Sequence, residues 1–368
     1  MVERSGGRVL VNAYENLGSQ PSVRFTGDWK EFAPIAITNF LLMLVTLGIY
    51  RFWAVARTRR YLWSKTEVAG DPLEWSGTGK EMFIGFALIF AVVLLPFYLL
   101  SQWVVPGLLA RGQDFLAGLI GIVLYVGLIY LGGFALFRAL RYRLSRTWWR
   151  GIRGGSEEPG WNYAGEALVY TFLTFITLGL AYPHTQAKLW NSRWNSMSFG
   201  SFRFEADLQS GPLYPRWLAL YALPILLIVL GAIGVGIGAA MSSTAESAGM
   251  LGLLGLLFVF AYLVIPLAMM AYYAKFYREA ASATQLEDVQ IFFDARTWGW
   301  IKLWLGNIAL ALVTLGVGAL FWAYRNWKFV VTHLELEGTI DMEEMAQSDT
   351  NVPTEAEGLA DAFDIGAF

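Results

Sequence analysis

The chain has 368 residues, of which 56% are hydrophobic and 15% are charged, and its net charge is −2. Soluble domains carry about 25% charged residues, so this composition excludes an ordinary water-soluble globular protein. The lack of cysteine excludes disulfides and thiolate chemistry. Eight acids and no bases lie between Asp341 and Phe368, which leaves +6 on the rest of the chain.

The N-terminal part of the chain predicts a lead, a strand and two helices. Residues 1–22 contain no apolar core, so we expect a flexible lead and not a signal peptide. Val23–Gly27 reads as a short strand, and the uncharged apolar run Phe32–Tyr50 follows it. Arg51–Thr66 then carries five bases and no acids, with apolar residues at helical spacing. A strand-prone stretch near Leu73–Trp75 ends this part.

Four longer runs contain no charge at all. They are Met82–Ala110, Phe115–Phe137, Trp217–Ala245 and Ser247–Ala274. Each has the roughly 20 apolar residues that a bilayer-spanning helix needs. We therefore predict two helical hairpins, each made of two membrane spans. An arginine cluster follows the first hairpin, and beside a span it favours anionic lipid over nucleic acid.

The tripeptide Thr-Leu-Gly occurs three times, at Thr46–Gly48, Thr177–Gly179 and Thr314–Gly316. Each copy ends an apolar run and precedes a cationic, aromatic segment. This spacing predicts an internal repeat, with unit 1 at 23–160, unit 2 at 161–285 and a partial unit 3 at 286–340. Short strand-like segments recur at Phe199–Phe204, Val289–Phe293 and Leu334–Gly338. The acidic tail, 341–368, lacks the apolar content to fold and is expected to be disordered.

A ring and a cation follow each copy at fixed offsets. Seven residues after the threonine stand Trp53, His184 and Phe321, and eleven residues after it stand Arg57, Lys188 and Arg325. Interface anchoring explains this pattern, and a lipid-headgroup or ligand site is the alternative. The candidate residues for headgroup or ligand binding are Trp53, Arg57, Arg60, His184, Lys188, Arg193, Arg325 and Lys328. Gly48, Gly179 and Gly316 are the expected helix breaks.

Charge counting separates two topologies. If all seven apolar runs cross the membrane, the 27 bases divide into 14 and 13, which violates the positive-inside rule. If only the two hairpins cross, 26 bases lie inside and Arg111 alone lies outside. We therefore prefer four spans, with the three Thr-Leu-Gly segments re-entrant or in-plane and both termini cytoplasmic. Seven spans stay the alternative, because Phe32–Tyr50 is long enough to cross.

No motif carries recognisable catalytic chemistry. Ser76–Lys80 resembles a phosphate loop but lacks the required flanking residues. His184 and His333 have no neighbouring ligands at metal-site spacing. We expect no catalytic residues, no metal and no cofactor, and a protein that is not an enzyme.

The segment from Thr46 to Gly85 (TLGIYRFWAVARTRRYLWSKTEVAGDPLEWSGTGKEMFIG) closely resembles the signature of the YjgN-like bacterial inner-membrane proteins. The resemblance covers most of residues 22–338. The second copy departs from it, with Tyr182, Pro183 and His184 where the first has Arg51, Phe52 and Trp53. The family is catalogued as a domain of unknown function, so the resemblance implies an inner-membrane location but no reaction and no functional residues.

Taken together, these features predict an all-α polytopic membrane protein built from repeats, with short cytoplasmic strand-like segments. The first functional hypothesis is a basic, aromatic cytoplasmic face that binds anionic lipid headgroups or a protein partner. The second is a transporter or channel for a small solute or lipid, with its path between the two hairpins. We expect no nucleic-acid partner, and a homo-oligomer stays open.

Overall fold

A computed structural model describes residues 10–12, 22–240, 244–341, 345–348 and 350. Its helices form three short hairpins and two long ones. The short hairpins are α1 (Trp29–Val45) with α2 (Arg51–Ser64), α7 (Trp161–Ile176) with α8 (Tyr182–Asn195), and α11 (Thr297–Val313) with the 3₁₀ turn η4 (Val317–Phe321) and α12 (Trp322–Val331). In each of them the Thr-Leu-Gly sequence forms the tip.

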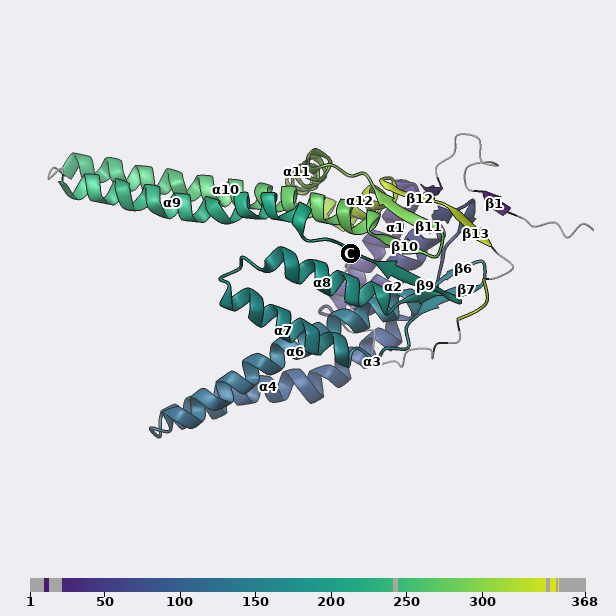
Figure 1. Ribbon diagram of the computed structural model, residues 1–368, viewed down its shortest axis with the longest axis horizontal. Helices are drawn as coiled ribbons and strands as arrows, with labels where there is room; N and C mark the ends of the chain where they lie inside the picture. The colour runs from purple at the N-terminus through teal and green to yellow at the C-terminus, as the bar shows by residue number, and fades with distance from the viewer. Residues whose placement is uncertain (1–9, 13–21, 241–243, 342–344, 349, 351–368) are drawn as a thin grey trace, which may run out of the picture.

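The two long hairpins project away from the rest of the molecule (Figure 1). In the first long hairpin, α6 (Asp114–Arg146) packs against a continuous helical arm. This arm consists of α3 (Gly79–Ile89), η1 (Phe90–Leu94), α4 (Leu95–Leu99), η2 (Leu100–Val104) and α5 (Val105–Leu109). In the second long hairpin, α10 (Thr244–Ser282) packs against η3 (Gly211–Leu213) and α9 (Tyr214–Ala240). Within the described residues, three stretches are long and apolar enough to cross a membrane: Gly79–Leu109, Asp114–Arg146 and Gly211–Gly234.

Two prolines explain why the helical arm from α3 to α5 contains π-helical segments. Pro96 and Pro106 lie in the first turns of α4 and α5, and a π-helical segment precedes each of them. Proline lacks an N–H and crowds the carbonyl four residues earlier. A widened π turn accommodates both effects without ending the helix.

The prediction of an all-α fold is wrong, because an eight-stranded antiparallel sheet runs through the base of the molecule. Its order is β12-β11-β10-β9-β8-β7-β6-β5. The strands are β5 (Glu74–Trp75), β6 (Thr147–Trp149), β7 (Ile152–Gly155), β8 (Ser198–Phe199), β9 (Phe202–Ala206), β10 (Thr284–Leu286), β11 (Val289–Phe293) and β12 (Leu334–Glu337). A three-stranded sheet contains β2 (Val23–Phe25), β3 (Thr66–Val68) and β4 (Asp71–Pro72), and β1 (Leu10–Asn12) pairs with β13 (Thr339–Asp341).

The sheet closes the base of both long hairpins. Glu74 pairs with Trp148 across the ends of the first long hairpin, and Ala206 pairs with Thr284 across the ends of the second. Gly154 pairs with Phe199 and joins these two parts into one sheet. Strands of two to five residues are not stable alone, so the helical hairpins hold the strand ends together while the strands fix the hairpin bases.

The first and third short hairpins pack on each other although they lie at opposite ends of the chain. The Phe32 ring stacks on that of Tyr324 with 5.4 Å between centroids, and the Tyr324 hydroxyl donates to the Gly27 carbonyl at 2.8 Å. Aromatic pairs of this kind add to the stabilisation from burial alone. The first and third short hairpins are therefore in direct contact through α1 and α12.

Part of the acidic tail lies against the sheet. Arg153 donates from its guanidinium to the Thr350 carbonyl, and Gln347 Nε2 donates to the Gly151 carbonyl at 2.9 Å. The Ser201 N–H donates to the Ala346 carbonyl at 3.1 Å. Residues 342–344, 349 and 351–368 of the predicted disordered tail lie outside the described residues, as do 1–9 and 13–21 of the predicted flexible lead.

Candidate functional site

The three Thr-Leu-Gly turns have the same backbone conformation. The leucines Leu47, Leu178 and Leu315 have φ values of 50°, 50° and 51°, and the glycines Gly48, Gly179 and Gly316 have φ values of 89°, 91° and 94°. Glycine adopts positive φ without penalty, whereas leucine does so at a cost. The three leucines therefore share one costly backbone conformation at equivalent positions.

In each turn, the threonine hydroxyl forms hydrogen bonds with the backbone on both sides of the turn. Thr46 Oγ1 donates to the Leu42 carbonyl at 2.7 Å and accepts from the Tyr50 N–H at 3.0 Å. The same pair of bonds forms at Thr177, with Leu173 and Ala181, and at Thr314, with Leu310 and Gly318.

The glycine, two residues after the threonine C-cap, closes each turn. The Gly48 N–H donates to the Met43 carbonyl at 2.8 Å, and Gly179 and Gly316 repeat this bond at 2.7 Å. This six-to-one hydrogen bond around a left-handed residue is the pattern of a Schellman cap. Together, threonine and glycine supply internal partners for backbone groups that would otherwise need water at the turn.

The tips of the short hairpins are apolar and exposed. Leu47, Leu178 and Leu315 are 94%, 76% and 95% exposed. Other exposed apolar residues surround them: Val45 and Ile49, Ile176 and Leu180, and Val313 and Val317. Small exposed patches are normal on soluble proteins; here an exposed apolar tip occurs at three equivalent turns.

The predicted rings after each turn take part in packing. Trp53 stacks on Tyr50 at 6.2 Å and lies 5.6 Å from the Phe83 ring. His184 meets the Tyr170 ring edge-on at 6.0 Å. In the third hairpin, the equivalent ring, Phe321, packs edge-on against Trp29 and Phe32. Trp53 and Phe321 therefore contact a neighbouring hairpin, whereas His184 contacts the other helix of its own hairpin.

The predicted cations divide into exposed and packed groups. Arg57, Arg60, Lys188 and Lys328 are exposed. Arg193 is buried with its guanidinium 5.5 Å from the Trp190 ring centroid. Arg325 is half-buried, and its Nε donates to Asn307 Oδ1 at 2.7 Å. Arg325 and Lys328 come together in an aromatic pocket of about 510 Å³ that Trp29 and Phe329 also line.

In two of the short hairpins, a buried asparagine links the two helices of that hairpin. These asparagines were not among the predicted site residues. Asn39 and Asn307 both stand seven residues before the turn threonine. Asn39 Nδ2 donates to Thr58 Oγ1 at 3.4 Å, and Asn307 Nδ2 donates to Asn326 Oδ1 at 2.9 Å. The signal was available in the sequence, because a polar residue at the same offset interrupts two otherwise apolar runs.

At the base of the first short hairpin, Tyr61 has a shifted pKa. Burial, with the neighbouring Glu31 carboxylate as the second cause, raises the pKa of Tyr61 to about 12. The Tyr61 hydroxyl donates to the Asp28 carbonyl at 2.8 Å, and Lys65 forms a 2.8 Å ion pair with Glu31. These contacts tie α1 to the end of α2.

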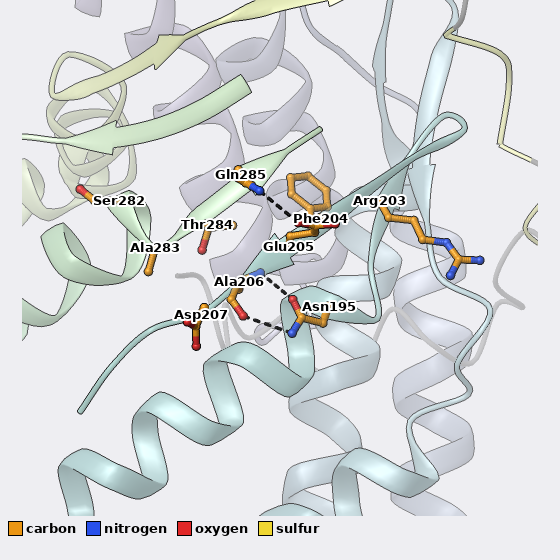
Figure 2. A pocket seen from close by; sticks show the side chains of 10 residues that line it. All are labelled: Asn195, Arg203, Phe204, Glu205, Ala206, Asp207, Ser282, Ala283, Thr284 and Gln285. Carbon is orange, nitrogen blue, oxygen red and sulfur yellow. Dashed lines mark hydrogen bonds between the residues drawn. The ribbon is translucent and has the colours of Figure 1, made fainter. Parts of the chain in front are cut away.

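A second surface pocket, of about 540 Å³, lies between α8 and strands β9 and β10 (Figure 2). The Asn195 side chain bonds both the N–H and the carbonyl of Ala206, at 2.6 and 3.2 Å. Gln285 Nε2 donates to Glu205 at 3.0 Å. These polar groups satisfy one another and hold β9 in place, so we assign the pocket a structural role. Among the residues that the structure describes, no cluster of three metal-ligating side chains occurs.

The fold and its apolar helices define a membrane-associated protein class. The chain belongs to the family described as "Bacterial protein of unknown function (DUF898)", which it matches over residues 20–362. It is 30% identical over 131 residues to the "Inner membrane protein YjgN" of Salmonella typhimurium strain LT2, and 31% identical over 129 residues to the protein of that name from Escherichia coli O157:H7. These matches cover 36% and 35% of this chain.

The same matches cover only 30% and 29% of the two relatives, so the chain aligns with under a third of their length. No solved structure matches the chain. The family description and the relatives' names contain no reaction. The suspected resemblance to the YjgN-like family is therefore confirmed, and with it the description of a family of unknown function.

Proposed function

We propose that this protein is a multi-span inner-membrane protein whose short hairpins dip into the cytoplasmic leaflet and bind anionic lipid there. The two long hairpins cross the bilayer, and both termini lie in the cytoplasm. The exposed cations Arg57, Arg60, Lys188 and Lys328 meet the headgroup layer. The observation that carries this proposal is the repeated turn, in which an exposed leucine stands between a threonine and a glycine that both hydrogen-bond the backbone of the turn.

The hydrogen bonding of the turns supports insertion. Backbone groups without partners are not tolerated in hydrocarbon, and the threonine and glycine of each tip supply such partners within the protein. In Figure 1, the tip between α7 and α8 points the same way as the α9–α10 hairpin and away from the sheet. A tip with this direction and an apolar surface fits a bilayer better than water.

The charge distribution supports the cytoplasmic side. Placing the sheet and short hairpins inside puts 26 of the 27 bases there, and only Arg111, at the tip of the first long hairpin, lies outside. Cytoplasmic segments of membrane proteins carry such an excess of lysine and arginine. Each cation near an anionic surface contributes about 1 kcal/mol of attraction.

A transport path between the long hairpins has no comparable support. The two hairpins diverge in Figure 1, and the α7–α8 hairpin lies between them. The anionic-lipid proposal is therefore the one that we develop.

Single-cysteine accessibility tests the topology, because the chain has no cysteine of its own. We would place cysteines at the exposed Ser64 and Ser201 and treat intact spheroplasts with a membrane-impermeant maleimide. The proposal predicts labelling of both only after permeabilisation. A cysteine at Gln113, beside Arg111, is the control that reacts from outside. Outside labelling of Ser64 or Ser201 would refute the four-span arrangement.

A further inference from the structure

A groove of about 510 Å³ lies between α11 and α12 of the third short hairpin, and Trp29 of α1 also lines it. Leu303 and Leu310 line it from α11. The lining residues of η4 and α12 recur at helical spacing and therefore share one face: Phe321, Tyr324, Arg325, Lys328 and Phe329. Pockets of about 300–1,000 Å³ hold small molecules or cofactors.

One end of the groove is cationic. Lys328 is exposed, and Arg325 is half-buried, with its Nε donating to Asn307 Oδ1 at 2.7 Å. Gly306 leaves room for this guanidinium, because a Cβ at that position would lie 2.7 Å from Arg325 Nη2. Neither cation forms an ion pair with any residue that the structure describes. Two positive charges one helical turn apart are therefore available at this end.

The acidic residues next to the groove have partners of their own. None of the described lining residues is acidic, but Asp28 and Glu31 lie close to Trp29 in the sequence. Asp28 Oδ1 accepts from the Lys30 N–H at 3.1 Å. Glu31 forms a 2.8 Å ion pair with Lys65. The cationic end therefore favours an anion, and guanidinium and ammonium groups both bind phosphate.

The other end of the groove is apolar and lies nearer the tip of the hairpin. Leu310 adjoins the turn, because its carbonyl accepts from Thr314 Oγ1 at 2.6 Å. Phe321 precedes Lys328 by seven residues, which corresponds to about 10 Å along a helix. The groove thus changes from cationic to apolar towards the tip, as an anionic lipid changes from headgroup to acyl chain.

We propose that this groove binds one molecule of an anionic phospholipid. Its phosphate lies between Arg325 and Lys328, and an acyl chain follows Phe321 and Leu310 towards the tip. The inference rests on the membrane placement proposed above, in which the tip lies in the leaflet and the cations lie at the headgroups. It goes further, because it assigns one bound molecule with a defined orientation instead of a surface preference.

Binding to the full-length protein in a neutral detergent tests the proposal without a bilayer. The probe is dioctanoyl-phosphatidylglycerol, its comparators are dioctanoyl-phosphatidylcholine and glycerol 3-phosphate, and the readouts are Kd and Tm. We expect phosphatidylglycerol to bind about tenfold more tightly than either comparator, because only this probe combines a net negative charge with acyl chains. Equal binding of phosphatidylcholine would refute the charge assignment, and equal binding of glycerol 3-phosphate would refute the acyl-chain assignment.

Two variants with matched controls test the location. Lys328→Gln removes an exposed charge and Trp29→Ala removes an exposed ring, and each should weaken phosphatidylglycerol binding about fivefold. Lys188→Gln removes the same charge from the second short hairpin. Trp298→Ala removes a tryptophan of α11 that is 60% exposed, against 55% for Trp29, and that is not among the described lining residues. Both controls should stay within about twofold of the parent.

Lys328→Gln changes a surface side chain, so it keeps the test valid if Trp29→Ala fails to fold. Equal effects of Lys328→Gln and Lys188→Gln would overturn the proposal, because general charge attraction would then explain the binding. Since no bilayer is present, this outcome is independent of whether the tips insert.

Discussion

The indole rings of Trp63 and Trp327 stack with 4.2 Å between centroids and 21° between planes. These residues belong to the first and third short hairpins. Trp63 Nε1 donates to Thr147 Oγ1 and Trp327 Nε1 donates to Thr66 Oγ1, both at 2.9 Å. The pair therefore joins the first and third short hairpins to the base of the first long hairpin.

Replacing Trp63 should destabilise this junction. Trp63 is buried, so Trp63→Ala is expected to lower the free energy of unfolding by about 3–5 kcal/mol, through lost burial and a cavity. Trp63→Phe keeps a ring and should lose less. Unfolding in mixed micelles with increasing SDS measures both. A loss below about 1 kcal/mol for Trp63→Ala, smaller than core truncations show, would mean that the stack does not hold the ends together.

The left-handed glycine can be tested without steric interference. Gly48 has φ +89°, and no atom lies within 4 Å of the point that a Cβ would occupy, so Gly48→Ala tests backbone strain alone. We expect a loss of about 1–2 kcal/mol. Gly118→Ala, on α6 and equally unobstructed, is the matched control and should gain about 0.5–1 kcal/mol. Equal effects of the two substitutions would contradict the strained turn.

High pH should destabilise the first short hairpin, because Tyr61 loses its proton more readily in the unfolded chain than in the fold. Its pKa is about 12 in the fold and near 10 when unfolded. Between these values the folded state retains a proton that the unfolded state has lost, so stability is complete below pH 10 and falls as the pH rises towards 12. Tyr61→Phe should flatten this fall. Denaturant midpoints from pH 9 to 12 measure it, and identical slopes for both proteins would exclude Tyr61 as the cause.

The exposed cations of α2 should select anionic lipid. Arg57→Gln combined with Arg60→Gln is expected to lower the preference for anionic over zwitterionic spin-labelled lipid severalfold, since each cation contributes about 1 kcal/mol near the surface. Electron paramagnetic resonance of the reconstituted protein measures the preference. Arg203→Gln on the sheet is the control. A preference that survives the double substitution would remove α2 from the headgroup layer.

Local structure was well predicted from the sequence because it depends on short-range patterns. Val289–Phe293 coincides with β11, and Arg51–Thr66 contains α2. The sheet was not predicted, because its pairings join segments far apart, such as Ala206 with Thr284. Strands of two or three residues, such as β5, are too short to show an alternating pattern, and their stability comes from the hairpins that hold them.

The same distinction applies to the candidate site. The ring and cation offsets identified residues on each short hairpin, and four of the cations are exposed. The packing of η4 and α12 against α1 and α2 was missed, because it joins segments far apart in the sequence. That packing follows from aromatic contacts such as Trp63 with Trp327, which no local pattern specifies.

The depth of the hairpin tips tests the central claim most directly. Single cysteines at Leu47, Leu178 and Leu315, each labelled with an environment-sensitive fluorophore in the reconstituted protein, report where the tips lie. Insertion predicts blue-shifted emission, strong quenching by nitroxides on lipid acyl chains and little quenching by aqueous iodide. Strong iodide quenching with no response to the nitroxide lipids at all three tips would contradict insertion.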